Sequence, residues 1–352
     1  MVDVDALERN VLKMAARARA AGAALRPHAK THKSAYVARL QVEAGAVGVC
    51  CAKLGEAEAL MSAGVRGVLV TSPIVGADCA TRAVALARMD PTFVLVADHP
   101  EQVRALGAAS GSARVRVLID VDVGLKRTGV ASAAAALELA AAIRAAPALA
   151  LLGVQGYGGH WQHIKGLEAR CDAVATGMQR LSEVVAALRK AGHLFDIVTG
   201  GGTGTFAADA ALRVLTELQP GSYVFMDGQY REALLNDVDG AFEPSLFVQA
   251  RAISANWPTH VTVDAGLKAF ATDGPLPRPF GERLAGSEYF WFGDEHGRLT
   301  QPPGRRPIAL GERIEFISPH CDPTVDRHRQ YVLVRGDTII GVAPIEAAQR
   351  SQ

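Results

Sequence analysis

A short basic segment near the N-terminus holds residue types that suit covalent chemistry with a carbonyl group. Two histidines and two lysines occur within six positions of the stretch Arg26-Pro27-His28-Ala29-Lys30-Thr31-His32-Lys33. A lysine that forms an imine needs a deprotonated amine, which a partly desolvated and cation-rich setting promotes. The alternative is an ordinary solvated basic loop, and composition alone favours that alternative.

A second segment is rich in glycine and threonine and offers groups that bind phosphate. Residues 199–205 read TGGGTGT. Bare backbone N–H groups and hydroxyls of this kind suit an anion, and the lack of a following Lys-Ser or Lys-Thr pair excludes a Walker loop. A flexible turn is the alternative. We expect a phosphate site, because the segment follows a predicted strand.

A third segment, residues 157–163, reads YGGHWQH and also follows a predicted strand. One tyrosine and two imidazoles at such a place can bind phosphate or move protons. A turn with incidental histidines is an equally good interpretation of this segment taken alone.

A fourth segment, residues 318–323, reads SPHCDP and follows an apolar strand. In an extended chain His320 and Asp322 point to one face and Cys321 to the other. Imidazole plus carboxylate suits Mn, Mg or Zn, and two protein ligands leave positions open for substrate and water. By itself the pattern is weak, and a polar turn is the favoured interpretation.

The elements that must position these residues alternate between short β-branched runs and Ala-rich amphipathic stretches. Eight strands alternating with helices over about 230 residues favour a (β/α)8 barrel, with a doubly wound open sheet as the alternative. In barrels the functional groups lie at the carboxyl ends of the strands, and the loops after strands seven and eight commonly bind phosphate. The predicted strands are 23–30, 46–50, 68–71, 92–97, 114–120, 151–157, 195–199 and 223–226.

After about residue 238 the helical patterns disappear and strand-like runs take over, punctuated by Gly and Pro. Such a pattern predicts an antiparallel β domain. We therefore expect a barrel over residues 8–238 and a β domain that consists of residues 239–352 together with residues 1–7. The predicted strands of the second part are 246–253, 260–264, 313–317 and 330–334.

Composition limits the classes of partner. The net charge of +1 gives no electrostatic case for nucleic acid, and no run approaches the roughly 20 apolar residues of a membrane span. Five cysteines without framework spacing suggest reduced thiols, and the N-terminus is charged from its first residues. We expect a cytoplasmic protein that acts on a small molecule.

Taken together, these segments resemble one family. RPHAKTHK, the YGGH segment, TGGGTGT, PGSYVFMD (residues 220–227) and the late HCDPT resemble the D-threonine aldolase and D-serine dehydratase family, which belongs to the alanine-racemase-like, fold-type III enzymes that use pyridoxal phosphate. The resemblance spans nearly the whole chain in the family's order. RPHxKxHK is its most specific part.

The resemblance implies roles for the cofactor site. Lys30 matches the lysine that forms the Schiff base with pyridoxal phosphate. Tyr157 matches the phosphate-binding set, and the glycine loop matches it through Thr199, Gly201 and Gly202. Tyr223 lies where the family brings a residue near the edge of the cofactor.

The resemblance also implies a proton-transfer group and a metal. His163 matches the catalytic base of the aldolase, and Arg127, in GLKRTG, matches an arginine near the pyridine ring or the phenolic oxygen. His320 and Asp322 match the metal pair. The dehydratase branch has Cys at the second metal position, so the carboxylate favours Mn or Mg over Zn, and the aldolase over the dehydratase.

The expected activity is cleavage of D-β-hydroxy-α-amino acids, which converts D-threonine to glycine and acetaldehyde. Dehydration of D-serine or 3-hydroxyaspartate and aldol cleavage of 3-hydroxyaspartate are the alternatives within the family. A racemase would not need the metal pair, and a non-catalytic pyridoxal phosphate carrier would need neither that pair nor the β domain. The resemblance also implies a homodimer.

Overall fold

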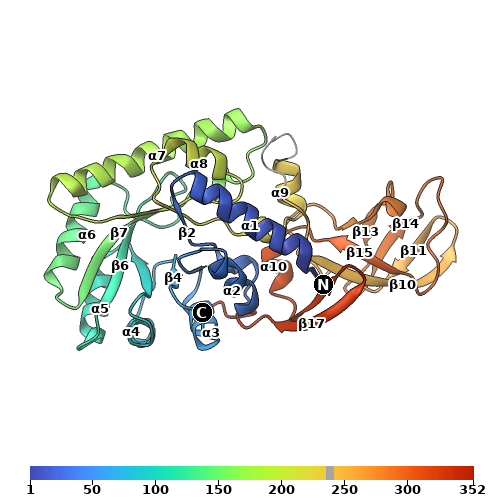
Figure 1. The fold of residues 1–352 in the computed structure, drawn as a ribbon, viewed down its shortest axis with the longest axis horizontal. Helices are drawn as coiled ribbons and strands as arrows, with labels where there is room; N and C mark the ends of the chain where they lie inside the picture. Colours follow the sequence, from blue (N-terminus) through green and yellow to red (C-terminus); the bar gives the residue numbers. More distant parts are fainter. Residues whose placement is uncertain (235–241) are drawn as a thin grey trace.

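The computed structural model describes residues 1–234 and 242–352, and Figure 1 shows its two parts. The first part is built on one sheet of eight parallel strands in the order β2-β9-β8-β7-β6-β5-β4-β3. A parallel bridge between His28 and Cys50 joins the two ends of this sheet. The predicted barrel is therefore confirmed. Its strands are β2 (Ala24–Leu25), β3 (Cys50–Cys51), β4 (Leu69–Val70), β5 (Val94–Ala97), β6 (Val115–Asp120), β7 (Leu149–Gly156), β8 (Ile197–Gly200) and β9 (Glu217–Leu218).

Helices follow the strands and cover the outside of the barrel (Figure 1). Small and branched apolar residues on their inner faces pack against the strands, while charged residues face outward. Serine side chains cap two of them, because Ser34 and Ser132 accept backbone N–H groups of the first turn. The helices are α1 (Val4–Ala20), α2 (Ala35–Glu43), α3 (Leu54–Ser62), α4 (Ala77–Met89), α5 (Pro100–Ser110), α6 (Ala133–Ala145), α7 (Leu167–Lys190), α8 (Phe206–Leu212) and α9 (Gly228–Ala233).

Three predicted strands differ from the structure, and one of them, expected at 46–50, lies at Cys50–Cys51 instead. The strand expected at 223–226 is wrong, because Ser222–Val224 forms a 3-10 turn, η3, and the eighth strand is β9. Two buried polar residues, Glu217 within β9 and Gln219 directly after it, hide this strand from a pattern search. The first strand ends at Leu25 rather than at Lys30. The chain beyond Pro27 forms a second 3-10 turn, η1 (Ala29–Thr31).

The second part is an antiparallel β domain, as predicted, with its own core around Phe270, Tyr289 and Phe316. A six-stranded sheet contains β10 (Phe247–Trp257), β11 (His260–Val263), β12 (Arg278–Pro279), β13 (Tyr289–Trp291), β14 (Gly297–Thr300) and β15 (Arg313–Ile317). A three-stranded sheet contains β1 (Val2–Asp3), β16 (Gln330–Arg335) and β17 (Thr338–Pro344).

The N-terminus belongs to both parts of the fold. Strand β1 pairs in parallel with β16, whereas α1 starts at Val4 and packs on the barrel. The expected domain boundary at 238/239 lies outside the described residues. A short helix, α10 (Cys321–Val325), follows β15 and lies where the two parts meet (Figure 1).

None of the described helices is long and apolar enough to cross a membrane. The five cysteines are all unpaired, as expected from their spacing.

Candidate active site

The basic segment forms a buried turn instead of a solvated loop. His28 and His32 are 8% and 0% exposed. Burial, together with the nearby Lys30 charge, lowers the pKa of His28 to about 3, and burial lowers the pKa of His32 to about 4. Both rings are therefore neutral at pH 7 and serve as hydrogen-bonding groups, since His28 contacts the Thr71 hydroxyl at 3.1 Å. Lys30 lies between them in η1 and lines a cavity of about 840 Å³.

Lys30 faces a carboxylate from the β domain. Its Nζ lies 2.8 Å from Oδ1 of Asp322, and this charge raises the pKa of Lys30. Burial alone would raise the pKa of Asp322, but Lys30 and His320 hold it at about 2. We expected a cation-rich setting that would favour a deprotonated lysine, and this expectation is wrong. Asp322, which is far away in the sequence, stabilises the charged form of Lys30.

His320 and Asp322 come together, although not by the predicted geometry. Asp322 lies in α10 and His320 caps this helix, so the extended-chain argument is wrong. Nevertheless, Nε2 of His320 lies 3.6 Å from Oδ2 of Asp322. Two ligand atoms each about 2.1 Å from one ion lie about 3–4 Å apart, so this spacing fits a shared metal.

Neighbouring side chains orient the two candidate ligands. Nδ1 of His320 lies 2.9 Å from Oδ2 of Asp273, which leaves Nε2 facing Asp322. Thr31 donates its hydroxyl to Oδ2 of Asp322 at 3.2 Å. Carboxylate partners of this kind fix the tautomer of a metal-binding histidine.

The donor set fits an open metal site. Within residues 1–234 and 242–352, no three His, Cys, Asp or Glu side chains are grouped to hold an ion. A structural site normally uses four protein ligands, so a pair matches an ion that also binds substrate and water. Cys321 is fully buried with its sulfur 3.7 Å from the Ser318 hydroxyl.

The cavity that contains Lys30 has the size of a cofactor site. Tyr157, at the end of β7, and Arg127 both line it. The Arg127 guanidinium lies over the Tyr157 ring at 5.9 Å from its centroid. Of the residues predicted around pyridoxal phosphate, Lys30, Arg127 and Tyr157 thus line one cavity.

His163 lies close enough to His320, Asp322 and Lys30 for their charges to act on its ring. Its ring packs on Tyr230 with centroids 4.6 Å apart. Burial, followed by the charges of His320 and Lys30, lowers its pKa, and Asp322 only partly offsets this. The imidazole is therefore neutral at pH 7 and able to accept a proton.

The glycine loop packs tightly against the turn after β7. A Cβ on Gly202 or Gly204 would meet Gln162 at 2.4 or 2.1 Å, so close packing requires glycine there. Gly201 has φ +73°, a conformation that side chains rarely adopt. The loop thus presents bare backbone, as a phosphate cradle requires.

Two of the predicted phosphate donors already have partners. Thr199 donates its hydroxyl to Oε1 of Glu217 at 3.0 Å, so that proton is not free for a phosphate. The N–H of Gly202 donates to the Thr205 hydroxyl at 3.1 Å. Thr199 is part of the barrel floor, and the phosphate role rests on the backbone around Gly201 and on Tyr157.

The side chain of Tyr223 does not face the cofactor cavity. It is fully buried, and its hydroxyl accepts a hydrogen bond from Gln41 on α2. The turn η3 directs the ring into the core, whereas the backbone N–H reaches Thr203 in the glycine loop. The expectation that its side chain borders the cofactor is therefore corrected.

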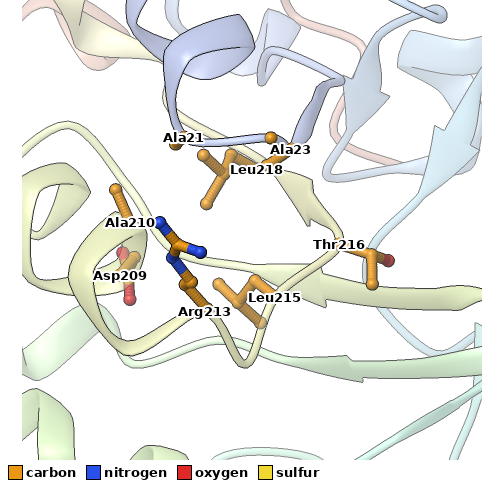
Figure 2. Close-up of a pocket in the computed structure, with 9 residues that line it drawn as sticks. Ala21, Ala23, Asp209, Ala210, Arg213, Leu215, Thr216 and Leu218 are labelled. Atoms are coloured by element: carbon orange, nitrogen blue, oxygen red, sulfur yellow. The ribbon is translucent and has the colours of Figure 1, made fainter.

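A buried carboxyl supports the glycine loop from behind. Oδ2 of Asp209 accepts the Thr205 hydroxyl at 2.6 Å, while its Oδ1 has no hydrogen-bond partner. Burial raises the pKa of Asp209 to about 7. Figure 2 shows Asp209 and Arg213 at a separate cavity of about 260 Å³ behind the loop.

Sequence patterns missed the polar floor of the barrel. Gln219 donates to Gln155 and Thr199, and Gln155 donates to Asp120, whose pKa burial raises to about 6. Asp120, Gln155 and Thr199 lie near the ends of three different strands, and Gln219 follows a fourth, so no single segment carries a recognisable motif. Asp273 was missed for a similar reason, since it lies in a Gly- and Pro-rich loop.

Both parts of the chain match known families. Residues 2–229 match the family described as "Alanine racemase, N-terminal domain". Residues 245–334 match the family described as "Putative serine dehydratase domain".

Three characterised relatives cover nearly the whole chain. A D-threonine aldolase from an Arthrobacter species is 37% identical over 99% of this chain and 91% of its own length. A 3-hydroxy-D-aspartate aldolase from Paracoccus denitrificans (strain Pd 1222) is 35% identical over 99% of this chain and 90% of its own. A D-threo-3-hydroxyaspartate dehydratase from Delftia sp. (strain HT23) is 28% identical, over 96% and 93%.

Solved structures show the same arrangement. The D-threonine aldolase from Filomicrobium marinum superposes with a TM-score of 0.94 at 36% identity, covering 99% of this chain and 94% of that one. The Delftia dehydratase superposes with a TM-score of 0.87 at 25% identity, covering 97% and 95%. Solved variants of that dehydratase replace a histidine and a cysteine two residues apart, and the cysteine variant is in a metal-free form.

Proposed function

The chain belongs to the alanine-racemase-like family, and on that premise we propose that it is an aldolase that uses pyridoxal phosphate and a divalent metal to cleave D-β-hydroxy-α-amino acids. D-Threonine would yield glycine and acetaldehyde. The high identity to two aldolases over nearly the whole chain supports this reaction. Lys30 would hold the cofactor, and His320 with Asp322 would hold the metal.

One observation carries the proposal, which is the contact between Lys30 and Asp322. Nζ of Lys30 lies 2.8 Å from a carboxylate oxygen of Asp322. The β-oxygen of a β-hydroxy amino acid lies three bonds from its nitrogen, about 3 Å away. A substrate nitrogen placed near Nζ of Lys30 would therefore bring its β-hydroxyl to the candidate metal ligands.

The chain's own side chains can then do the remaining work. Pyridoxal phosphate supplies an electron sink for the carbon–carbon bond that breaks, and a divalent metal supplies a Lewis acid that makes the hydroxyl more acidic. His163, neutral at pH 7, takes the proton from the β-oxygen. Asp273 orients His320, and Thr31 orients Asp322. Arg127 and Tyr157 line the same cavity as Lys30 and would hold the cofactor there.

We infer that the metal is Mn or Mg rather than Zn. The supporting residue is Asp322, because carboxylate oxygen suits these harder ions and thiolate suits Zn. The dehydratase relative has a cysteine variant in a metal-free form, with the spacing that His320 and Asp322 show here. A carboxylate in place of cysteine supports cleavage of the C–C bond over loss of the hydroxyl.

We also propose a homodimer that works in the cytoplasm on a free amino acid. The family resemblance supports the dimer, and the unpaired cysteines support a reducing compartment. The balanced charge offers no basis for binding nucleic acid.

A product assay with three substrates tests the proposed reaction. The protein, loaded with pyridoxal phosphate and Mn, is incubated with D-threonine, L-threonine and D-serine, and aldehyde and ammonia are measured separately. We expect acetaldehyde and glycine from D-threonine and little product from L-threonine. Faster release of ammonia from D-serine than of acetaldehyde from D-threonine would reject the aldolase assignment.

A second candidate substrate is 3-hydroxy-D-aspartate. The relative that cleaves it is nearly as similar as the D-threonine aldolase. In addition, Lys53 and Arg127 supply two exposed cations to the cavity wall, which suit a second carboxylate. A higher kcat/KM for glyoxylate release than for acetaldehyde release would assign this substrate.

A further inference from the structure

Lys33 turns away from the cavity into a partly buried ionic cluster between the two domains. Its backbone is left-handed, with φ 52°, and its side chain is not among those that line the cavity of Lys30. The side chain is 10% exposed. Its Nζ lies 3.1 Å from Oε1 of Glu56 and 2.7 Å from Oδ1 of Asp326. A left-handed lysine costs energy, and such a conformation persists where its surroundings require it.

One end of this cluster holds the helix that carries the metal ligand. Asp326 ends α10, and its N–H donates to the carbonyl of Asp322. Asp322 and Asp326 are therefore one turn apart on the same short helix. The backbone N–H of Gln349 also donates to Oδ1 of Asp326, which ties the C-terminal segment to the same point.

The other end of the cluster holds the rim of the cofactor cavity. Oε2 of Glu56 accepts the backbone N–H groups of Ala52 and Lys53, and both of these residues line the cavity. The carbonyl of Lys33 accepts the N–H of Ala347. One ammonium group thus connects the turn of Lys30, the cavity rim and α10.

The contacts from Lys30 and Thr31 to Asp322 cannot hold the turn of Lys30 against α10 once a cofactor and a metal are bound. Three side-chain links join the turn to α10 in the described residues, and two of them, from Lys30 and Thr31, end on Asp322. A metal on Asp322 and a cofactor on Lys30 would redirect these groups. The pair of Lys33 with Asp326 ends on neither, so it persists when both sites are filled.

We propose that Lys33 is a positioning residue that fixes α10, and with it Asp322, against the cofactor lysine across the domain junction. The inference rests on the metal site of the proposed function. A metal ligand held by a flexible short helix binds weakly, and removal of supporting contacts typically costs about 10- to 100-fold in metal affinity.

The Mn²⁺ dissociation constant of the cofactor-loaded protein, measured by electron paramagnetic resonance at 25 °C, tests this role. Asp326→Asn keeps the Lys33–Glu56 pair, so it folds more readily than Lys33→Met, which leaves the buried carboxylate of Glu56 and the partly exposed one of Asp326 without their cation. We expect Asp326→Asn to weaken Mn²⁺ binding about tenfold and Lys33→Met to weaken it more, with Lys33→Arg restoring part of the affinity. The cofactor absorbance should stay unchanged in Asp326→Asn.

Glu295→Gln is the matched control, because it removes an exposed ion pair with Lys268 in the same domain. Its Mn²⁺ affinity should equal that of the wild type. If Asp326→Asn lowers the melting temperature but binds Mn²⁺ within twofold of the wild type, Lys33 has a structural role only and the inference is wrong. If the wild type itself binds no Mn²⁺, the metal site fails, and the inference fails with it.

Discussion

Replacing Asp209 by asparagine should change how the stability of the protein depends on pH. Burial raises the pKa of this carboxyl from 3.8 to about 7 in the folded protein. The folded state thus favours the neutral form. Below about pH 4 the carboxyl is neutral in both the folded and the unfolded wild type, so its ionisation costs no stability. As the pH rises toward 7, the wild type loses stability because the carboxyl ionises in the unfolded state only. The asparagine variant has no group that ionises here, so its stability lacks this dependence on pH.

The size of the effect follows from the pKa difference. In a comparison of pH 5 with pH 8.5, the starting point of pH 5 lies about 2 pH units below the folded pKa of Asp209. Over these units the free energy of unfolding falls by about 1.36 kcal/mol per unit, and above the folded pKa it no longer changes. The wild type should therefore lose roughly 3 kcal/mol relative to the variant. With an unfolding entropy of about 2.1 cal/mol/K per residue over 352 residues, this corresponds to about 4 °C in melting temperature.

Thermal melts of both proteins at pH 5 and pH 8.5 measure this effect. The difference between variant and wild type should be about 4 °C larger at pH 8.5 than at pH 5. Any hydrogen bond that the buried amide of the Asp209→Asn variant fails to make costs the same stability at both pH values. This cost therefore cancels when the two differences in melting temperature are compared. Asp337→Asn, in an exposed turn, is the control. A difference that is equal at both pH values, or smaller at pH 8.5, would refute the reasoning about burial.

Four further variants test the site itself. Lys30→Ala should lose the absorbance of bound cofactor and the product of borohydride trapping, and retention of a reducible adduct would contradict its role. Gly201→Val should raise the dissociation constant of pyridoxal phosphate roughly tenfold, because a side chain at φ +73° costs about 1–2 kcal/mol and meets a carboxylate; unchanged affinity would argue against this loop. His163→Gln should lower kcat by about 10²- to 10⁴-fold with little change in cofactor binding, and an unchanged kcat would remove it as the base. Asp322→Cys should shift the metal preference toward Zn and slow aldol cleavage, which competition between Mn and Zn would show.

The sequence predicted most of the barrel, because buried parallel strands leave β-branched runs between amphipathic helices. The strand at Glu217–Leu218 escaped, since Glu217 and the following Gln219 belong to the polar floor and interrupt the apolar pattern. Tyr223 was misplaced for a related reason. The pattern PGSY carries no information on whether the ring points to the cofactor or into the core, and packing on Phe242 decides this.

The candidate site was predictable in its residue types but not in its contacts. Lys30 and Asp322 were each singled out, yet no local pattern indicates that a carboxylate on a β domain meets a lysine on the first barrel strand's loop. Lys33 pairs with Glu56 and Asp326, which come from two distant segments of the sequence. Long-range ionic contacts of this kind depend on the tertiary fold, which sequence spacing does not encode.

Metal removal and return on the cofactor-loaded protein test the central claim most directly. Acetaldehyde release from D-threonine and the cofactor absorbance are measured together during chelation and then during titration with Mn²⁺. The proposed site predicts that turnover disappears on chelation and returns with Mn²⁺, while the absorbance and the fold stay intact throughout. Turnover that survives complete chelation, or loss of folded structure on chelation, would contradict a catalytic metal held by His320 and Asp322 beside Lys30.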